Sequence, residues 1–318
     1  MSPNRLILGT RGSELALTQT ATVTALLAQA HPGLGIEREI IQTTGDRRQD
    51  LRFAQFAEVA QVDKGIFIKE LEQALAEGRV DAAVHSLKDL PSELAAGYAL
   101  GAILPRADVA DVLVSQRWSC LAELPEAARV GTSSVRRAAQ LRWLRPDLEV
   151  VEIRGNVPTR VRRVMGEDGL DAVLLAAAGL QRLGLWNGQG IEMDGVHLHA
   201  QRLPVEEFLP AAGQGAIAVE CRAVDQQTLA HLAAIHHQPT ALLIRAEREF
   251  LRLLGAGCQT PVGLRTWMDA TGLGMAARVF DESDLGAKPL EGQAIGSPDE
   301  PEALASSLIA LLGLQRKG

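Results

Sequence analysis

Apolar and polar segments alternate in the N-terminal part of the chain in a pattern that predicts strands followed by helices. The apolar run at 5–10 (RLILGT) suits a buried strand, and Ser13 is positioned to cap a helix whose apolar positions run from Leu15 to about Ala30. Further elements are expected as a strand near 36–43, a helix around Phe67, Leu71 and Leu75 that Gly78 ends, and a strand at 80–85. This order is a βαβαβ unit, which builds an α/β lobe.

The same pattern returns after Pro105 and predicts a second lobe. A strand ends near Val130, a helix begins at Ser133 and Ser134, and Pro146 ends that helix. The remaining elements are a strand at 148–153, a helix with Pro158 in its first turn and a strand at 170–176.

The C-terminal part predicts a smaller α/β domain. A helical run from Pro239 to Leu254 precedes two strand-like stretches and a final helix near 301–312. Irregular spacing between Trp186 and Pro210 indicates that the chain there returns from the second lobe toward the first. We therefore expect an α/β protein with two doubly wound lobes and a third domain, divided as 1–104 with 210–235, 105–209, and 236–318.

Composition makes this a globular enzyme-sized chain without an evident membrane segment. Its 318 residues are 47% hydrophobic and 22% charged, and no window of membrane-spanning length lacks charges. The N-terminus shows no signal peptide, and Cys120, Cys221 and Cys258 form neither a disulfide framework nor a zinc motif. We expect a cytoplasmic protein without a metal site, and the net charge of −7 argues against a nucleic-acid partner.

Arginine is concentrated in one segment of this acidic chain. Residues 129–163 contain nine arginines, no lysine and three acids, a local excess of +6. Guanidinium groups bind planar carboxylates through paired hydrogen bonds, so the cluster favours a small polyanion as ligand. A solvated helix face is the alternative interpretation.

Three turns predict sites for anionic groups. TRGS (10–13), GTSSVRR (131–137) and RGNVPTR (154–160) each place an arginine and a capping or turn-forming residue where a strand leads into a helix. Free backbone amides at a helix N-terminus favour negative charge. Each turn alone is also what an ordinary capped helix requires.

Two further motifs are candidates for chemistry. HSLKD (85–89) places Lys88 and Asp89 directly after a strand, where a carboxylate can exchange protons with a bound amine; a surface ion pair is the alternative, with His85 a packed or hydrogen-bonded residue. GAGCQTPVG (255–263) places Cys258 in a glycine loop after an arginine-rich helix, where a thiolate is reactive, although most cysteines are inert.

Other motifs fail on their context. Gly213 to Ala218 matches a dinucleotide fingerprint, but a strand-forming run follows it where a nicotinamide site needs a helix. The pairs His197/His199 and His236/His237 lack the spacing of a metal motif.

Taken together, the motifs resemble the ordered series of the porphobilinogen deaminase family. They are TRGS, KGIFIKELE (64–72), HSLKD, GTSSVRR, RGNVPTR, AGLQRLGL (178–185), PAAGQGAIAVECR (210–222) and GAGCQTPVG. The resemblance implies two lobes like those of periplasmic binding proteins and a cofactor-bearing third domain. It also implies an enzyme, hydroxymethylbilane synthase, that joins four porphobilinogen molecules head to tail and releases ammonia in tetrapyrrole (haem) biosynthesis.

The resemblance further implies roles for individual residues. The cofactor is a dipyrromethane joined to Cys258 through a thioether. Asp89 is the catalytic carboxylate, and Lys88 and Arg11 are further catalytic residues. Residues implied to bind the cofactor are Ser13, Lys88, Asp89, Thr132, Ser133, Ser134, Arg136, Arg137, Arg154 and Gly155. Residues implied to bind the substrate are Arg11, Ser13, Lys64, Arg154, Arg160, Arg182 and Gln214. Each added pyrrole brings an acetate and a propionate, which gives the arginine cluster a physical reason.

The chain departs from the family pattern before Lys64. Where relatives commonly have a Gly-Gly pair, this chain has Ala60-Gln61-Val62-Asp63 and a longer apolar insert at 52–59. Phe53, Phe56 and Val59 have helical spacing, so we expect a short helix over the mouth of the cleft. Two other classes compete with the enzyme: a two-lobed solute-binding protein, and a phosphate-handling transferase, which would need an acidic metal motif that the sequence lacks. A monomer is expected.

Overall fold

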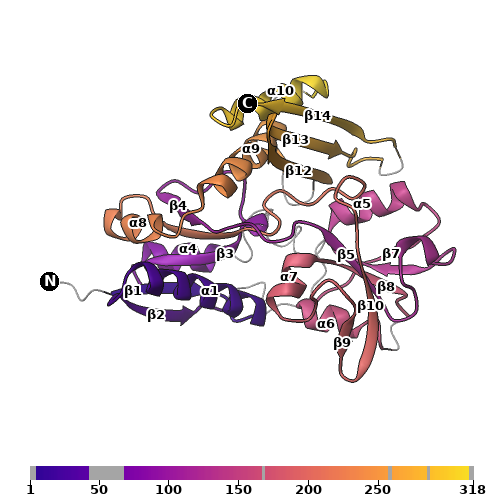
Figure 1. Ribbon diagram of the computed structural model, residues 1–318, viewed down its shortest axis with the longest axis horizontal. Coiled ribbons are helices and arrows are strands. Elements are labelled where there is room, and N and C mark those ends of the chain that lie inside the picture. The colour runs from indigo at the N-terminus through magenta and orange to yellow at the C-terminus, as the bar shows by residue number, and fades with distance from the viewer. Residues whose placement is uncertain (1–4, 43–67, 167–168, 257–259, 285–286, 315–318) are drawn as a thin grey trace. The chain divides into compact units, whose positions relative to one another are not determined.

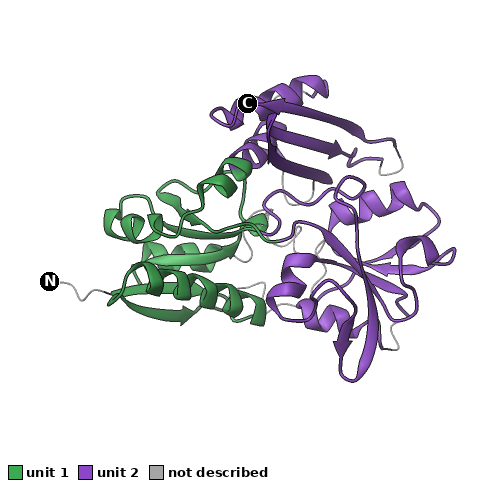
Figure 2. Ribbon diagram, in the orientation of Figure 1, with its two compact units in different colours: residues 1–107, 216–244 green, residues 108–215, 245–318 purple. Residues whose placement is uncertain are grey.

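The computed structural model describes residues 5–42, 68–166, 169–256, 260–284 and 287–314 (Figure 1). By their internal contacts they form two compact units, 1–107 with 216–244 and 108–215 with 245–318 (Figure 2). The helix predicted at 52–59 lies outside the described residues. Within the described residues, no helix has both the length and the apolar character needed to cross a membrane.

The first unit contains a five-stranded mixed sheet. Its strand order is β2-β1-β3-β11-β4, with β1 parallel to β2 and β3, and β11 antiparallel to β3 and β4. The strands are β1 (Arg5–Thr10), β2 (Gly35–Ile40), β3 (Ala82–Ser86), β4 (Tyr98–Ile103) and β11 (Ile217–Arg222). The helices are α1 (Glu14–Ala30), α4 (Lys69–Ala76), the short 3₁₀ helix η1 (Leu87–Asp89) and α8 (Gln226–Ala233).

Local sequence explains how α1 begins and packs. The hydroxyl of Ser13 accepts a hydrogen bond from the backbone amide of Ala16, as its capping role predicts. Val23 and Leu27 on one face of α1 are fully buried, and they share a core with Leu6 and Leu8 of β1. The packed strand and helix fix the turn between them, which carries Arg11.

The second unit contains a six-stranded mixed sheet and a three-stranded one. The larger sheet has the order β7-β6-β8-β5-β10-β9, in which β6 is parallel to β7 and β8 and the other pairs are antiparallel. Its strands are β5 (Asp111–Ser115), β6 (Arg129–Gly131), β7 (Glu149–Val151), β8 (Ala172–Ala176), β9 (Ile191–Met193) and β10 (Val196–Arg202). Its helices are η2 (Leu121–Glu123), α5 (Val135–Leu144), α6 (Val157–Arg162) and α7 (Ala177–Arg182).

The three-stranded sheet is an antiparallel meander near the C-terminus. It consists of β12 (Val262–Asp269), β13 (Gly272–Val279) and β14 (Leu290–Gly296), and α10 (Pro301–Leu311) packs on β13 and β14. Helix α9 (Gln238–Leu254) precedes it, and the division between the two units falls inside this helix (Figure 2).

The structure confirms the α/β class and adds strands that the sequence pattern did not predict. The smaller sheet has three strands where two were expected. Strand β14 was not predicted because it is largely exposed and lacks an apolar face. The strand-forming run after Gly215 is β11, which confirms that no dinucleotide helix follows the glycines. The boundaries proposed for three domains stay a prediction.

Candidate functional site

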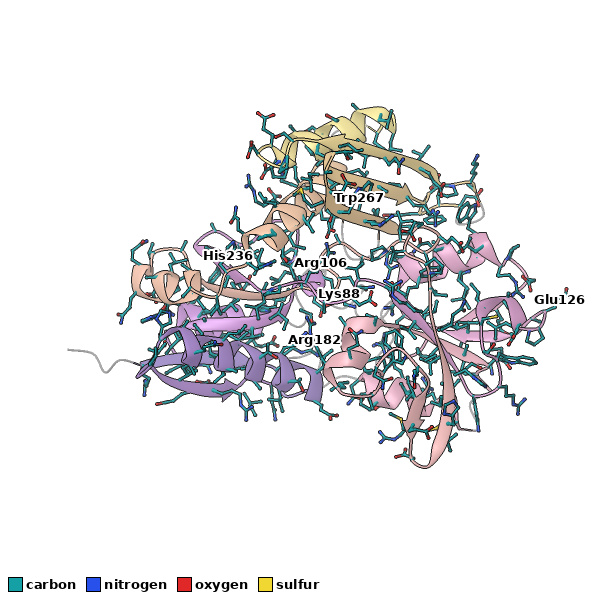
Figure 3. All side chains as sticks on the ribbon, viewed as in Figure 1. Lys88, Arg106, Glu126, Arg182, His236 and Trp267 are labelled. Atoms are coloured by element: carbon teal, nitrogen blue, oxygen red, sulfur yellow. The ribbon has the colours of Figure 1, made fainter. Side chains whose placement is uncertain are left out.

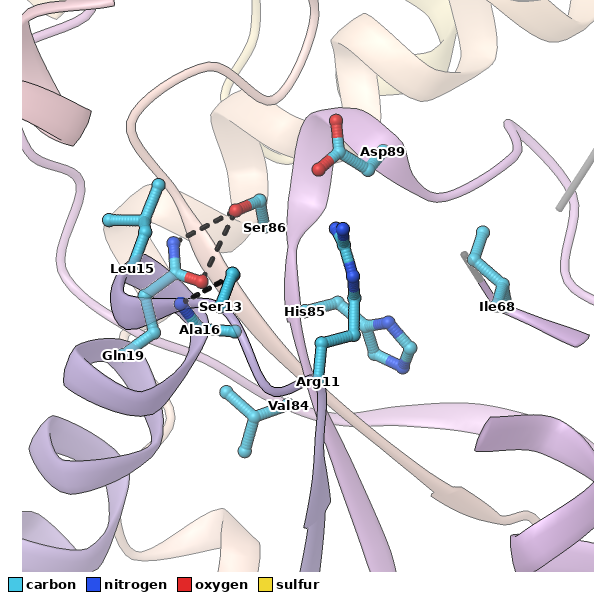
Figure 4. A pocket seen from close by; sticks show the side chains of 10 residues that line it. All are labelled: Arg11, Ser13, Leu15, Ala16, Gln19, Ile68, Val84, His85, Ser86 and Asp89. Atoms are coloured by element: carbon cyan, nitrogen blue, oxygen red, sulfur yellow. Dashed lines mark hydrogen bonds between the residues drawn. The ribbon is translucent and has the colours of Figure 1, made fainter. Parts of the chain in front are cut away.

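A pocket lies at one edge of the first sheet, where β1 and β3 both end. These strands are neighbours and parallel, so the residues that follow them meet at the same edge. Arg11, Ser13, His85, Ser86 and Asp89 line the pocket together with residues of α1, and its volume is about 70 Å³. The close-up shows Arg11, His85 and Asp89 between the α1 residues and Ile68 (Figure 4).

The predicted pair of Arg11 and Asp89 is therefore brought together. Asp89 is exposed at the end of η1, Arg11 is half-buried, and their charged groups point toward the same space (Figure 4). Lys88, next to Asp89, is also exposed. A carboxylate beside a guanidinium at an open pocket can hold a cationic or N–H-bearing ligand while the guanidinium holds its acidic groups.

Gln19 fixes the opposite wall of this pocket. Its side-chain amide is buried and exchanges hydrogen bonds with the hydroxyl of Ser86, at 2.9 Å from the nitrogen and 3.2 Å to the oxygen. This link joins α1 to the end of β3 and orients the turn that carries Asp89. Sequence reasoning missed both residues, since neither has a distinguishing neighbour.

In the second unit, the two turns predicted to bind anionic groups follow β6 and β7. The two strands are parallel neighbours, so the turns after them lie side by side. The hydroxyl of Ser133 donates to the carbonyl of Ile153, and the amide of Thr132 donates to Val151 at 2.9 Å. Residues 132–134 and 154–155 thus form one continuous edge.

Each of these turns leads into a capped helix. Ser134 caps α5 by accepting from the amide of Arg137 at 3.4 Å, and Asn156 caps α6 through Thr159 at 2.9 Å. Arg160 donates to the carbonyl of Gly155 at 2.8 Å, and Arg154 pairs with Glu152 at 3.2 Å. Arg154, Gly155 and Arg160 remain half-buried, so their edge is accessible to a ligand.

Arg136 and Arg137 differ from the others because they are buried against Asp111. The carboxylate of Asp111 lies 2.8 Å from Nη2 of Arg136 and 2.7 Å from Nη2 of Arg137, and it is fully buried. Burial alone would raise the pKa of Asp111, but the two guanidinium charges outweigh burial and hold this pKa well below its ordinary value. Burial lowers the pKa of Arg136, and Asp111 opposes this shift.

Two members of the arginine cluster expected from the sequence are thus buried against an internal acid, and their predicted binding of the cofactor stays a prediction. Their charge is shared with an internal carboxylate that the sequence reasoning missed. Asp111 heads the apolar run DVLVS, and a single acid at the start of a buried strand is the signal that could have identified it.

Gln214 and Arg182 fix the loop before β11. The buried amide nitrogen of Gln214 donates to the carbonyl of Val109 at 2.7 Å and to Asp111 at 2.9 Å. Arg182 donates to the carbonyl of Gly215 at 2.7 Å, and burial lowers its pKa. Glu247 of α9 accepts from the amide of Gly213 at 2.6 Å. Both predicted substrate-binding residues therefore have structural contacts in this unit.

Two of the three cysteines belong to the described residues, and they differ in burial. Cys221 is fully buried in the core, and burial, with Asp225 adding to it, raises the pKa of its thiol to about 11. Cys120 is partly exposed. Cys258 and Lys64 lie outside the described residues.

Fold and site together define an α/β protein whose two larger sheets each carry polar, anion-binding turns at the ends of parallel strands. Two family models match the chain. "Porphobilinogen deaminase, dipyromethane cofactor binding domain" matches residues 6–230, and "Porphobilinogen deaminase, C-terminal domain" matches residues 241–312. The chain belongs to the porphobilinogen deaminase family.

Curated relatives agree over nearly the whole length. The porphobilinogen deaminase of Moorella thermoacetica is 46% identical over 300 residues, covering 94% of this chain and 90% of the relative. That of Syntrophomonas wolfei is 44% identical over 313 residues, covering 98% and 96%.

Solved structures give a weaker similarity. The methionine-binding protein MetQ is 11% identical, with a TM-score of 0.44, over 73% of this chain and 89% of MetQ. A periplasmic substrate-binding protein of an ABC transporter from Coxiella burnetii is 13% identical, with a TM-score of 0.43, over 76% and 96%.

Proposed function

We propose that the chain joins four porphobilinogen molecules head to tail and releases four ammonia molecules and 1-hydroxymethylbilane, the hydroxymethylbilane synthase reaction of tetrapyrrole biosynthesis. The observation that supports this best is the pocket in which Asp89 and Arg11 lie together, in a chain of this family. The enzyme is a transferase of class EC 2.5.1.61.

Asp89 is the proposed catalytic carboxylate. Its exposed position lets it bind the N–H groups of a pyrrole and stabilise the positive charge that develops as ammonia leaves. Arg11, with Ser13 and Lys88, would hold the acetate and propionate groups of the same ring and so fix its orientation. Substrate carboxylates would also meet Lys64, Arg154, Arg160, Arg182 and Gln214.

The residues suit a carboxylate-bearing dipyrromethane. The proposed attachment point is the thiol of Cys258, and the proposed contacts are Ser13, Lys88, Asp89, Thr132, Ser133, Ser134, Arg136, Arg137, Arg154 and Gly155. Among the described residues, Nε of buried Arg136 has no acceptor, and a ligand carboxylate is the kind of group that would complete it. When bound, the dipyrromethane primes the product chain and stays on the protein.

Further features complete the proposal. The chain acts as a monomer in the cytoplasm, on a small-molecule substrate without a nucleic-acid or membrane partner. Its three domains comprise 1–104 with 210–235, 105–209, and 236–318, the last carrying Cys258.

Intact-protein mass spectrometry of the wild type, Cys258→Ser and the matched control Cys120→Ser tests the proposal. We expect a covalent adduct in the wild type and in Cys120→Ser, absent from Cys258→Ser, together with loss of porphobilinogen consumption only in Cys258→Ser. A wild type that carries no adduct and makes no tetrapyrrole would refute it. If Cys258→Ser retained both ligand affinity and all measured function, a solute-binding protein would be the better description.

A further inference from the structure

Two histidines of the second unit lie side by side on the hairpin formed by β9 and β10 (Figure 1). His197 and His199 flank Leu198, which is fully buried, so both imidazoles stand on the opposite, more exposed face of the strand. Their ring centroids are 5.7 Å apart, and the ring planes are nearly perpendicular, at 89°. The two rings are therefore close enough to bind one ligand together.

A carboxylate fixes where the proton of His197 lies. Nδ1 of His197 is 2.5 Å from Oε1 of Glu192, the residue directly opposite on β9. An ionised carboxylate only accepts hydrogen bonds, so in the neutral ring Nδ1 carries the proton and Nε2 keeps its lone pair. Histidines that bind metal ions commonly have this arrangement, in which the other ring nitrogen donates to a carboxylate.

The unprotonated nitrogen of His197 lies on the side of the ring nearer to His199. A Cβ added to Gly190 would lie 2.4 Å from Cε1 and 2.8 Å from Nε2 of His197, so this edge of the ring covers Gly190. The pairs of His197 with Glu192 and of Leu198 with Ile191 continue in register to place Gly190 opposite His199. The glycine thus leaves room for the ring of His197 to lean along the hairpin toward the second histidine.

The surroundings of the pair favour a cation. The side chains of His197 and Glu192 are 58% and 71% exposed, so a solvated ion can reach them. Glu123 of η2 lies near His199: the pKa of Glu123 is lowered first by its hydrogen bonds to Ser119 and also by the charge of His199. Two acids therefore lie close to the two histidines.

The distance between the rings suits a shared metal ion. With metal–nitrogen distances of about 2.0–2.1 Å, two imidazoles on one ion have centroids roughly 4.5–5 Å apart. The observed distance is slightly longer, and exposed side chains close such a gap by small rotations about their torsions. Among the described residues, no group of three or more His, Cys, Asp or Glu is arranged to hold a metal ion, so water would complete the coordination.

We propose that His197 and His199 form a two-histidine surface site for a late divalent transition metal ion, with Glu192 as the carboxylate that orients His197. Imidazole nitrogens suit Ni²⁺, Cu²⁺ and Zn²⁺, and Cu²⁺ binds tightest in the general order of affinities. The site belongs to the second unit, whereas the pocket of Arg11 and Asp89 belongs to the first, and it does not depend on the proposed function. It revises the expectation, drawn from sequence spacing, of a chain without a metal site.

A second histidine pair shows that distance alone does not make such a site. The rings of His31 and His231 are closer, with centroids 4.9 Å apart. However, Nε2 of His31 contacts the carbonyl of His231 at 2.9 Å, and Nε2 of His231 is buried. These two nitrogens are not offered to a solvated ion, so His31→Gln is the matched control.

Isothermal titration calorimetry with NiCl₂ tests the site in the untagged full-length protein. We expect one Ni²⁺ per chain at the strongest site, and a Kd that is weaker by about tenfold or more in His197→Gln and in His199→Gln, since a lost ligand costs at least as much as a lost outer carboxylate. Glu192→Gln keeps both imidazoles and should weaken binding about tenfold. His31→Gln should bind as the wild type does. A wild type that binds no Ni²⁺, or an unchanged Kd in His197→Gln, would overturn the proposal.

Electron paramagnetic resonance of the Cu²⁺ complex identifies the ligands directly. Cys120→Ser is the background for this measurement, so that the partly exposed thiol does not react with the ion. The spectrum should show coupling to two imidazole nitrogens, reduced to one when His197→Gln or His199→Gln is added. An unchanged nitrogen pattern in either variant would show that Cu²⁺ binds elsewhere and that the proposal is wrong.

The two histidine variants should keep the thermal midpoint, the Cys258 adduct and the turnover of the wild type, because the pair lies at the surface of the second unit. The two proposals therefore fail separately. Absence of the adduct from the wild type would count against the proposed function alone, and an unchanged Ni²⁺ affinity in His197→Gln would count against the metal site alone.

Discussion

At the scale of single residues, charge pairing inside the protein decides which of the predicted groups are buried and which are accessible. Arg136 and Arg154 have the same chemistry, but Arg136 is 4% exposed against Asp111 while Arg154 lies half-buried at the edge of the sheet. The sequence shows both only as members of an arginine-rich segment. The side chains of the described residues are drawn together in Figure 3, where Lys88 and Arg182 are labelled.

Asp111→Asn should destabilise the protein strongly, because it leaves two buried guanidinium groups without a counter-charge. We expect the free energy of unfolding to fall by about 3–5 kcal/mol at neutral pH, measured by chemical denaturation. The folded pKa of Asp111 lies below its unfolded value near 4, so its contribution is complete above about pH 4 and is lost as the pH falls further. The gap between wild type and variant should therefore close only below that pH.

Asp194→Asn is the control for this change. Asp194 pairs with Arg162 at 2.7 Å, but both side chains are more than half exposed. Asp194→Asn should lower the free energy of unfolding much less than Asp111→Asn does. An equal loss in the two variants would contradict the role given to burial.

The two fully described cysteines should differ in reactivity. Alkylation of the native protein with iodoacetamide at pH 8 should modify Cys120 and spare Cys221, since burial raises the pKa of Cys221 to about 11 and blocks access. Peptide mass spectrometry reads the result, and unfolding in denaturant should expose both thiols. Equal native labelling would show that the first unit opens around β11.

At the scale of elements, caps and turns made the helices predictable. The side chains of Ser13, Ser134 and Asn156 each accept a hydrogen bond from a backbone amide of the first helical turn, as an N-cap does. Helices α1, α5 and α6 begin where the sequence places them. Strand β14 could not be predicted, since its sequence has no apolar face. Its residues form a strand only through their pairing with β13.

Gly155→Ala should disturb the turn between β7 and α6. Gly155 has φ of +107°, and a Cβ there would lie 2.7 Å from Cγ2 of Thr159, so backbone strain and collision add together. We expect a loss of about 1–3 kcal/mol, seen as a lower thermal midpoint, together with weaker binding of the cofactor.

Gly184→Ala separates strain from collision. Gly184 also has positive φ, at +67°, but a Cβ would meet nothing within 4 Å. Gly184→Ala should lower the free energy of unfolding by only about 1–2 kcal/mol and leave the cofactor content unchanged. A larger loss at position 184 than at 155 would contradict the steric argument.

At the scale of the molecule, a buried arginine links the small C-terminal sheet to the six-stranded sheet within the second unit. Arg278 of β13 donates to the carbonyl of Glu207 at 2.5 Å and to Oε1 of Gln140 at 3.2 Å, and its guanidinium lies 4.3 Å from the ring centre of Trp143. Gln140 in turn donates to the carbonyl of Leu209 at 2.9 Å, which also accepts from Arg136.

Arg278→Met should therefore loosen the small sheet from the rest of its unit. We expect about 1–3 kcal/mol of destabilisation, because buried acceptors lose their donor, and faster amide hydrogen exchange in β12 to β14. Arg265→Met is the control: Arg265 stacks on Trp267 at 5.0 Å and binds exposed Glu206, so its loss should matter less. Equal effects would contradict the linking role of Arg278.

The sequence by itself determined the class of fold, the helix starts and the turns that carry Arg11, Asp89 and Ser133. These features depend on local periodicity, capping and strand-to-helix order, which neighbouring residues set. Only the tertiary structure decided that Asp111 shares the charge of two arginines, that Gln19 holds Ser86, and that Glu220 lies beside His85. Those pairs join residues far apart in the chain, and a buried charge acquires its partner from packing between strands and helices rather than from its neighbours in sequence.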